Sequence, residues 1–537
     1  MKRLSFLIAC CIASLCQAFV ATLRGDIKTD IATLSGVLYN LDTRYVDTVN
    51  IDQLTEVAIK AVLKELDPHT TYMSPAEVRQ FREGLDGGFE GIGVSFRMVH
   101  DTILVIHPVA GGPSEQVGIQ PGDLIISCND SLLAGRSLSN DDIKQQLRGP
   151  KGSIARLGIQ RGNEPKLRYF DVSRGQIPVH SVQTYYMATP TVGYIYVDRF
   201  GLTTASEVAA AIKELTNQGM QDLVLDLQDN GGGYLNVAVD MAALFLPPLS
   251  LVVYTEGRSD ERRQYNTSIF SSQFKGRLVV IIDEQSASAS EILAGAIQDY
   301  DRGVIVGRRS FGKGLVQRPV DLPNGGLMRM TVSHYYTPSG RCIQKPYTNG
   351  NQKDYHEDLL NRLHSGELVS ADSIHLADSL KYYTKAGRTV YGGGGIMPDA
   401  FVPLDTTRMA PAHRAIVART TMLDYTLQYF RANHAELHRR YPTLSDFDAP
   451  DAGFKLSDDM VLDLIEQARR DSVTAEDLDS LVTNELFRTQ VRAYIANNLY
   501  DNGAYKRIIN ATSWPYLRSL EILADDRRYN ALLQGAD

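Results

Sequence analysis

Two short segments constrain this chain more than any others. The first, residues 286–291 (Ser-Ala-Ser-Ala-Ser-Glu), follows the apolar run 278–282 and opens a helical pattern. A small hydroxyl residue at a strand-to-helix turn lies beside the free N–H groups of the helix start, which can stabilise a developing oxyanion. The second, residues 311–317 (Phe-Gly-Lys-Gly-Leu-Val-Gln), contains a lysine at position 313. Together the two segments predict a serine nucleophile and its lysine base.

The lysine can serve as a base only in a buried position. An unperturbed lysine has a pKa near 10.4, so at neutral pH it is protonated and cannot accept the serine proton. The apolar residues Phe311, Leu315 and Val316 around Lys313 provide an environment that lowers this pKa. Gln317 stands four residues further on and, in a strand with a period of two, lies on the same side as Lys313, where its amide can orient the amine.

Other interpretations of these segments are open. The serines could be helix caps and small packing residues. Residues 307–313 also match the spacing of a phosphate-binding loop as far as the lysine, but Gly314 follows where that loop needs Ser or Thr. The next residues indicate a strand where a phosphate loop requires a helix. The pattern therefore disfavours nucleotide binding, and we expect no cofactor.

Composition and charge fit an enzyme of several domains. With 537 residues, 43% of them hydrophobic, the chain can bury several cores, and its length suggests roughly three to four domains. A net charge of −8 argues against a nucleic-acid partner.

Residues 1–18 have the pattern of a secretory signal peptide, with two basic residues, an apolar run and a small-residue cleavage site. The mature chain is then expected to start near Phe19 and to be exported, to the periplasm. The run is shorter than the ~20 apolar residues of a membrane-spanning helix. Membrane association through lipidation of Cys10 is an open alternative. Only Cys128 and Cys342 remain after cleavage, so no disulfide framework is implied.

Changes of pattern along the chain predict an α/β multidomain fold. Four regions are expected after the signal peptide. Residues 19–86 are helical, and residues 87–175 contain short β runs separated by glycine turns. Residues 176–404 alternate strands and helices as an α/β core does, with a polar insertion at about 349–388. Residues 405–537 are helical again.

The second region resembles a PDZ domain, β-rich with one or two helices. Its glycine motifs occur in the order of that domain, at residues 91–94, 112–115, 118–123 and 148–152. A Gly-x-Gly loop presents backbone N–H groups that can hold the terminal carboxylate of a peptide that adds as a strand. The residues expected to bind a peptide C-terminus are Gly91, Ile92, Gly93 and Val94.

Histidines give no indication of a metal site. His434 and His438 lie one helical turn apart, but the sequence offers no third ligand near them, and a solvated helix face explains their spacing. We therefore expect no metal.

Over nearly the whole stretch from residue 66 to residue 403, the chain resembles the carboxyl-terminal processing peptidases, also called tail-specific proteases. The motifs that carry the resemblance are residues 66–70 (Leu-Asp-Pro-His-Thr), the PDZ elements, residues 226–233 (Asp-Leu-Gln-Asp-Asn-Gly-Gly-Gly), 286–299, 311–317 and 335–341 (Tyr-Tyr-Thr-Pro-Ser-Gly-Arg). The resemblance implies a protease core of the ClpP/crotonase type between the N-terminal helices, the PDZ domain and a C-terminal helical extension.

The resemblance also implies site residues. The nucleophile is Ser288 and the general base Lys313, 25 residues later as the family pattern requires, with Gln317 as the third catalytic member. The oxyanion hole combines the N–H of Ala289 with that of Gly232, and Gly231 is the rival for the second donor. In one departure from the family, Gln228 stands where arginine is frequent, which places a charge-based role at that position in doubt.

These observations predict an exported serine endopeptidase whose PDZ domain binds the apolar C-terminal tails of protein or peptide substrates. The alternative is a catalytically silent PDZ adaptor that binds protein tails. The same site chemistry could also serve acyl transfer on another amide or ester. The family resemblance suggests a homodimer formed through the helical ends.

Overall fold

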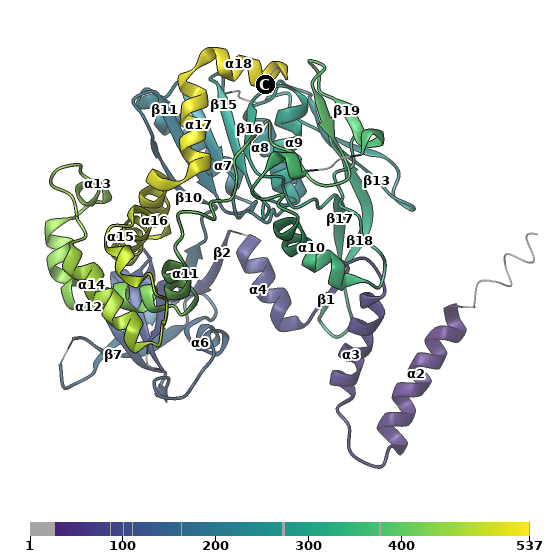
Figure 1. Ribbon diagram of the computed structural model, residues 1–537. Helices are drawn as coiled ribbons and strands as arrows, with labels where there is room; N and C mark the ends of the chain where they lie inside the picture. The colour runs from purple at the N-terminus through teal and green to yellow at the C-terminus, as the bar shows by residue number, and fades with distance from the viewer. Residues whose placement is uncertain are drawn as a thin grey trace, which may run out of the picture.

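The computed structural model describes residues 27–85, 87–99, 101–109, 111–162, 164–270, 274–374 and 377–535 (Figure 1). The predicted signal peptide and Cys10 lie outside these residues. Within the described residues, no helix is both long and apolar enough to cross a bilayer.

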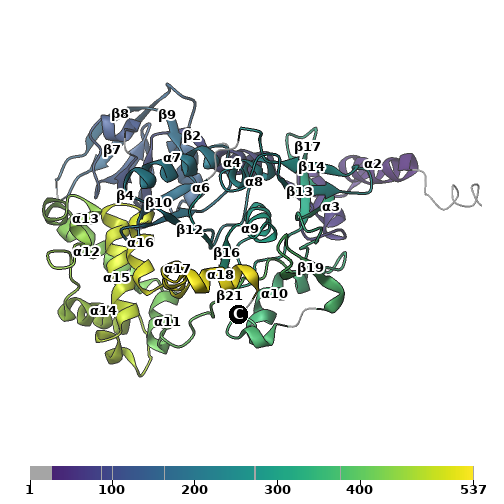
Figure 2. The ribbon, with the colours of Figure 1, turned by 90° about the horizontal axis from the view of Figure 1, so that it is seen from above.

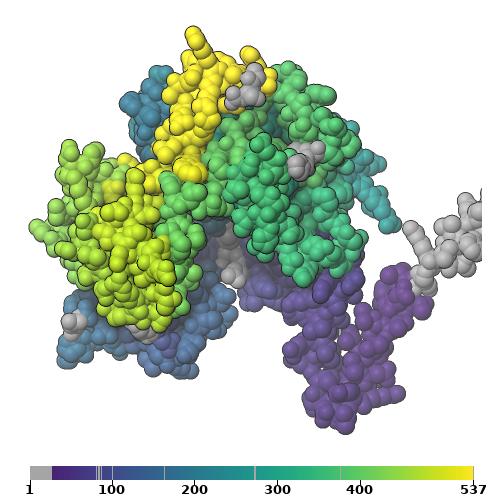
Figure 3. Space-filling view, in the orientation of Figure 1, coloured from purple at the N-terminus to yellow at the C-terminus, as the bar shows by residue number. Residues whose placement is uncertain are grey.

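The N-terminal region is helical and extends away from the rest of the molecule (Figures 1 and 3). Helix α2 (Ile27–Arg44) has no buried residue, and α3 (Ile51–Lys64) begins where the Asn50 side chain accepts a hydrogen bond from Gln53 N. Strand β1 (Thr71–Met73) pairs with β18 (Leu327–Tyr336) of the protease core, and α4 (Pro75–Leu85) follows it. The motif at residues 66–70 is thereby attached to the core.

The PDZ region forms a partly open sheet in the order β3-β4-β5-β7-β8, so β3 is an edge strand, and β6 pairs with β5. Beside the sheet, β2 pairs with β9 at the junction with the core. Its elements are β2 (Gly88–Gly91), β3 (Val94–Val99), β4 (Thr102–Pro108), α5 (Pro113–Gln116), β5 (Leu124–Cys128), β6 (Ser131–Leu132), α6 (Asn140–Leu147), β7 (Ile154–Gln160), β8 (Arg168–Ser173) and β9 (Gly175–Pro178).

The protease core is built on a sheet in the order β10-β11-β12-β15-β16-β21, parallel except for the β10–β11 pair. All residues of β11, β12, β15 and β16 are buried, as expected for parallel strands covered on both faces. The elements of this layer are β10 (Val182–Met187), β11 (Val192–Val197), α7 (Thr204–Asn217), β12 (Asp222–Asp226), α8 (Leu235–Ala242), β15 (Leu278–Ile282), α9 (Ala289–Asp299), β16 (Val304–Gly307) and β21 (Ala400–Phe401).

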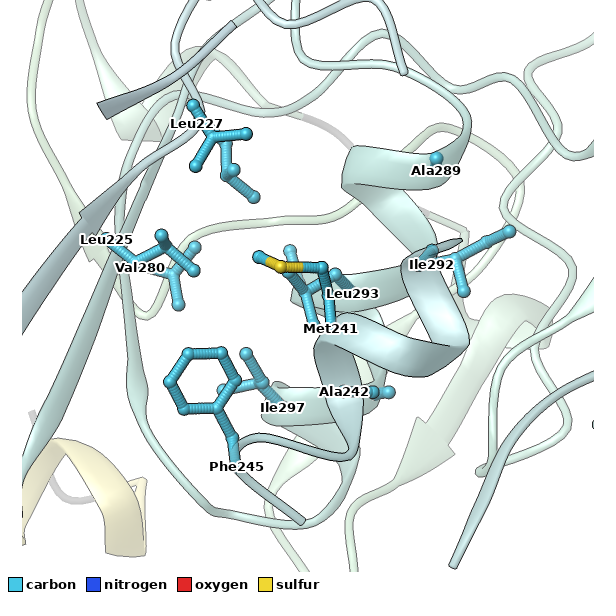
Figure 4. Close-up of a cluster of buried hydrophobic side chains, with 14 of the residues drawn as sticks. Leu225, Leu227, Met241, Ala242, Phe245, Val280, Ala289, Ile292, Leu293 and Ile297 are labelled. Atoms are coloured by element: carbon cyan, nitrogen blue, oxygen red, sulfur yellow. The ribbon is translucent and has the colours of Figure 1, made fainter. Parts of the chain in front are cut away.

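Alternate residues of the core strands pack against different helices. Leu225 and Val280 face α8 and α9, where they meet Met241, Leu293 and Ile297 (Figure 4). Their neighbours, such as Val224 and Val279, pack instead against the last two helices of the chain, α17 (Trp514–Ala524) and α18 (Asp526–Gln534). The two C-terminal helices therefore form the third layer of an α/β/α core. The sequence predicted a helical C-terminal region but not that its last helices cover the core sheet.

A second sheet lies beside this core and carries the lysine segment. Strand β18 pairs with β17 (Leu315–Asp321), β1 and β13 (Leu251–Glu256), and β13 also pairs with β14 (Arg263–Asn266). The polar insertion contains α10 (Gln352–His364) and β19 (Lys381–Tyr383), which forms a hairpin with β20 (Thr389–Tyr391) directly after the insertion.

The remaining C-terminal helices form a bundle beside the PDZ domain (Figures 1 and 2). Leu104 and Ile106 of β4 are part of the hydrophobic core of this bundle, so the PDZ domain and the bundle are packed together. The bundle helices are α11 (Pro411–Ala418), α12 (Thr421–Arg440), α13 (Leu444–Phe447), α14 (Asp458–Arg470), α15 (Glu485–Leu499) and α16 (Asn502–Ile509).

Candidate active site

The nucleophile candidate lies in a strained turn between β15 and α9. Ser288 has φ 58° and ψ −111°, in the left-handed half of conformational space that non-glycine residues seldom occupy. Its N–H donates to Glu291 Oε2 over 2.8 Å, which satisfies one of the free donors at the helix start. Such backbone strain persists where the surrounding structure enforces it, as at functional sites.

The three serines of the motif have different surroundings. Ser286 and Ser290 are fully buried, and their hydroxyl groups donate to the carbonyl oxygens of Leu227 and Asn230, each over 2.8 Å. Both serines therefore fasten the turn to the glycine loop after β12. Ser288 is partly exposed and lines a pocket with a volume of about 400 Å³. Only this serine of the three borders the pocket.

The lysine and glutamine candidates line the same pocket. Lys313 precedes β17, Gln317 lies within it, and both border the pocket together with the glycine loop. Burial and, to a smaller extent, the nearby Arg329 lower the pKa of Lys313 from 10.5 to about 8, against the opposing effect of Glu291 and Asp67. An amine with this pKa is neutral in a substantial fraction of molecules near neutral pH, as a general base must be.

A buried glutamate, whose role the sequence did not reveal, joins the two segments. Glu291 is fully buried and its carboxylate accepts four hydrogen bonds: from Ser288 N (2.8 Å), Ser310 Oγ (2.5 Å), Gly312 N (2.7 Å) and Lys313 N (2.9 Å). Burial raises the pKa of this carboxyl to about 7, although the hydrogen bonds oppose the shift. The only sequence signal for this role is an acidic residue in the first turn of α9.

Glycine is required beside the nucleophile. Gly232 has φ 96°, and a Cβ atom there would lie 2.9 Å from Ser288 Cβ and 2.6 Å from Ala287 O. Its N–H donates to Asn230 Oδ1 over 2.9 Å, so an oxyanion would have to share or replace that acceptor. Among the described residues, no acceptor is found for the N–H groups of Ala289 and Gly231.

The motif at residues 66–70 reaches the pocket through a chain of hydrogen bonds. Gln317 Nε2 donates to Thr331 Oγ1 (3.3 Å), which donates to Asp67 Oδ1 (2.8 Å). His69, beside this aspartate, lies within 2.8 Å of the Tyr355 hydroxyl through Nε2. Burial and the charge of Lys313 lower the pKa of His69 to about 3, so this histidine is neutral at physiological pH.

The PDZ domain contains a separate groove between β3 and α6, with a volume of about 420 Å³. Ile92, Gly93 and Val94 line it at the end where the Gly-x-Gly loop lies. Ile92 also belongs to the hydrophobic core of the domain. For the Gly93 N–H, the described residues provide no acceptor.

No cluster of three or more His, Cys, Asp or Glu side chains able to hold a metal ion is found among the described residues. His434 and His438 lie on α12 of the bundle, away from the pocket residues named above. Burial raises the pKa of both Cys128 and Cys342, which keeps these thiols protonated.

Comparison with family models matches three parts of the chain. Residues 191–356 match peptidase family S41, residues 91–169 match the PDZ domain, and residues 412–501 match a family of unknown function (DUF8443). The first of these ranges contains the serine, lysine and glutamine of the pocket. The second contains every groove-lining residue except Phe89, and the third lies in the C-terminal bundle.

Individual proteins are also similar to this chain. A CtpA-like serine protease of Staphylococcus epidermidis is 33% identical over 323 residues, which cover 60% of this chain and 65% of that protein. One from Staphylococcus aureus is 34% identical and covers 59% and 64%, respectively. The chain thus spans just under two thirds of the length of these relatives.

A solved photosystem II D1 C-terminal processing protease is 30% identical, with 57% of this chain and 83% of that chain covered and a TM-score of 0.33. On the family models, residues 191–356 are similar to peptidase family S41 and residues 91–169 to the PDZ domain, and the sequence relatives are CtpA-like serine proteases.

Proposed function

We propose that this chain is an exported serine endopeptidase that binds protein C-termini through its PDZ domain and cleaves by an acyl-enzyme mechanism. The observation that carries the proposal is that Ser288, Lys313 and Gln317 line one pocket, behind which the buried Glu291 joins the serine turn to the lysine segment by hydrogen bonds. The lowered pKa of Lys313 supports its assignment as the base.

In the first half of the reaction, Lys313 Nζ takes the proton of Ser288 Oγ as that oxygen attacks the carbonyl carbon of the scissile peptide bond. The N–H of Ala289 and a glycine N–H, from Gly232 or Gly231, stabilise the oxyanion that forms. The C–N bond then breaks, and protonated Lys313 returns its proton to the departing amine. The product is an ester between Ser288 and the acyl part of the substrate.

In the second half, water attacks the ester carbon while Lys313 accepts its proton. The ester C–O bond breaks, Ser288 Oγ regains the proton, and a carboxylic acid is released. Gln317 supports Lys313 through its place in the same pocket and its link to Thr331. Its role is to position the amine, because its amide cannot itself act as a base.

The test is digestion of β-casein by the purified full chain and by Ser288→Ala. We expect cleavage by the native chain and none by Ser288→Ala, whereas Ser206→Ala, an exposed serine of α7, retains full activity. Activity in Ser288→Ala would overturn the choice of nucleophile. If the native chain bound peptide tails and cleaved nothing, the adaptor alternative would replace the peptidase.

Export is part of the proposal and rests on the basic and apolar residues of the first 18 positions. N-terminal sequencing of the protein recovered from its producing cells should find a start near Phe19. An intact Met1 in the mature protein would contradict cleavage of a signal peptide.

A further inference from the structure

The wall of the PDZ groove is basic, although the chain as a whole has a net charge of −8. Apolar side chains cover much of the groove, as expected for a site that holds an apolar tail. Three cationic residues also line it, and none of its lining residues is acidic: the cations are Arg97, Lys144 and Arg148. This distribution of charge is complementary to a ligand that carries negative charge beyond its terminal carboxylate.

The geometry of strand addition relates each groove residue to a position in the bound tail. Because β3 is an edge strand, a peptide can add antiparallel to it with its C-terminal residue beside the 91–94 loop. Each residue back from the terminus then lies one residue further along β3. If the terminal residue is opposite Val94, Arg97 is opposite the fourth residue from the end, and opposed residues share a face of the sheet.

The two faces of β3 have different surroundings. Val94, Phe96 and Met98 pack against the PDZ core, so the terminal residue and the third from the end face the apolar groove. Arg97 lies on the other face, in register with Leu104 of β4. Its side chain still reaches the groove and contributes to the lining.

Arg97 differs from the other two cations in its hydrogen bonding. Its Nη1 atom is buried and has no hydrogen-bond partner among the described residues. Lys144 is paired with Asp141 at 2.9 Å, and the Arg148 guanidinium lies over the Phe89 ring at 4.4 Å. No carboxylate among the described residues is paired with Arg97, so the carboxylate of a ligand in the groove can supply a charged acceptor for its guanidinium.

We propose that the PDZ groove selects protein tails with Asp or Glu at the fourth residue from the C-terminus, followed by an apolar terminal residue, and that Arg97 binds the acidic side chain. This specificity rests on the proposed function of the PDZ domain as the part that captures the substrate. It narrows the substrates from apolar tails in general to apolar tails with one defined acidic position.

The experiment measures binding and does not depend on cleavage. The full chain with Ser288→Ala is titrated against two fluorescent decapeptides with the same apolar terminus, one with Glu and one with Gln at the fourth residue from the end. A hydrogen bond to a charged group contributes about 1.5–3 kcal/mol, so the Glu peptide should bind at least roughly tenfold tighter by fluorescence anisotropy.

Adding Arg97→Gln should abolish this difference and leave the affinity of the Gln peptide unchanged, which also shows that the domain is folded. The control Arg156→Gln, a PDZ arginine that stacks on Tyr169 outside the groove, should keep the preference. Equal affinities in the parent protein, or a Glu preference that survives Arg97→Gln, would overturn the proposal. A Glu preference in the parent protein, together with no cleavage of any peptide by the native chain, would overturn the peptidase assignment alone.

Discussion

The candidate active-site pocket and the PDZ groove are similar in volume, about 400 and 420 Å³, but their polar groups are arranged in opposite ways. In the pocket, the Glu291 carboxylate accepts four hydrogen bonds and fixes the serine turn to the lysine segment. In the groove, Gly93 N–H and Arg97 Nη1 have no acceptor among the described residues.

This difference in hydrogen bonding fits a reaction site in the pocket and a recognition site in the groove. A reaction site gains from groups that are already held in place, because no reorganisation is then needed in the transition state. A recognition site gains from donors that only the ligand can satisfy, because their desolvation is then compensated on binding. Changes in the pocket should therefore lower kcat, and changes in the groove should raise KM or Kd.

The largest effect is expected from Lys313→Ala. Removal of the base removes the covalent route, so kcat should fall on the order of a thousandfold or more, as in other nucleophile-base pairs. Steady-state cleavage of a fluorogenic peptide measures this, with Lys353→Ala, an exposed lysine of α10, as the control. Substantial turnover by a folded Lys313→Ala protein would contradict the assignment of Lys313 as the base, and with it the distinction between a reaction pocket and a recognition groove.

Glu291→Gln tests whether the fixed geometry of the pocket matters. The amide NH₂ of glutamine would face backbone N–H groups that now donate to a carboxylate, and each such bond is worth about 1.5–3 kcal/mol. We expect kcat to fall by about a hundredfold with little change in KM, on the rule that ~1.4 kcal/mol is a factor of ten. Glu466→Gln, on the exposed face of α14, serves as the matched control. A rise in KM with kcat retained would speak against a positioning role.

Amidation of the substrate C-terminus probes the groove. The amide removes the charge that the 91–94 loop is expected to bind, at a cost of about 1.5–3 kcal/mol. At substrate concentrations below KM, cleavage of the amidated peptide should be roughly ten- to a hundredfold slower than that of the free acid, because its KM is higher. Equal rates would show that the PDZ domain does not recognise the terminus.

The smallest expected effect is the pH dependence of kcat. Only neutral Lys313 is active, and its pKa is lowered to about 8, so the rate should rise about tenfold between pH 7 and pH 9. Glu291 raises the pKa of Lys313, so the rise should shift to lower pH in Glu291→Gln. EDTA should leave the rate unchanged. A profile that is flat across this range, or activity lost to EDTA and restored by zinc, would contradict a lysine base.

Local patterns in the sequence were sufficient for much of this arrangement. The strand-turn-helix pattern around Ser288 and the apolar surroundings of Lys313, together with the 25-residue interval that the family resemblance implies, predicted two segments that the structure places on one pocket. The helical pattern expected after the serine segment is observed as α9 (Ala289–Asp299). Glycine spacing predicted the PDZ domain, which the family comparison confirms.

Contacts between distant residues could not be predicted in this way. The four hydrogen bonds of Glu291 join residues up to 22 positions apart, and the pairing of β1 with β18 joins residues 71 and 329. The packing of α17 and α18 on the core sheet depends on which faces of the strands are left uncovered. Whether the Gly232 N–H is available to an oxyanion depends on the orientation of the Asn230 side chain, which accepts its hydrogen bond. The spacing of residues in the sequence does not predict that orientation.

The central claim is that Ser288 is acylated with Lys313 as its base, and direct detection of the acyl-enzyme tests it best. The full chain is mixed with a peptide p-nitrophenyl ester, quenched in acid within its first turnovers and analysed by mass spectrometry. We predict one acyl group on Ser288 in the native chain and none in Ser288→Ala or Lys313→Ala. An adduct on another residue, or peptide turnover in the native chain with no adduct at any quench time, would contradict the account.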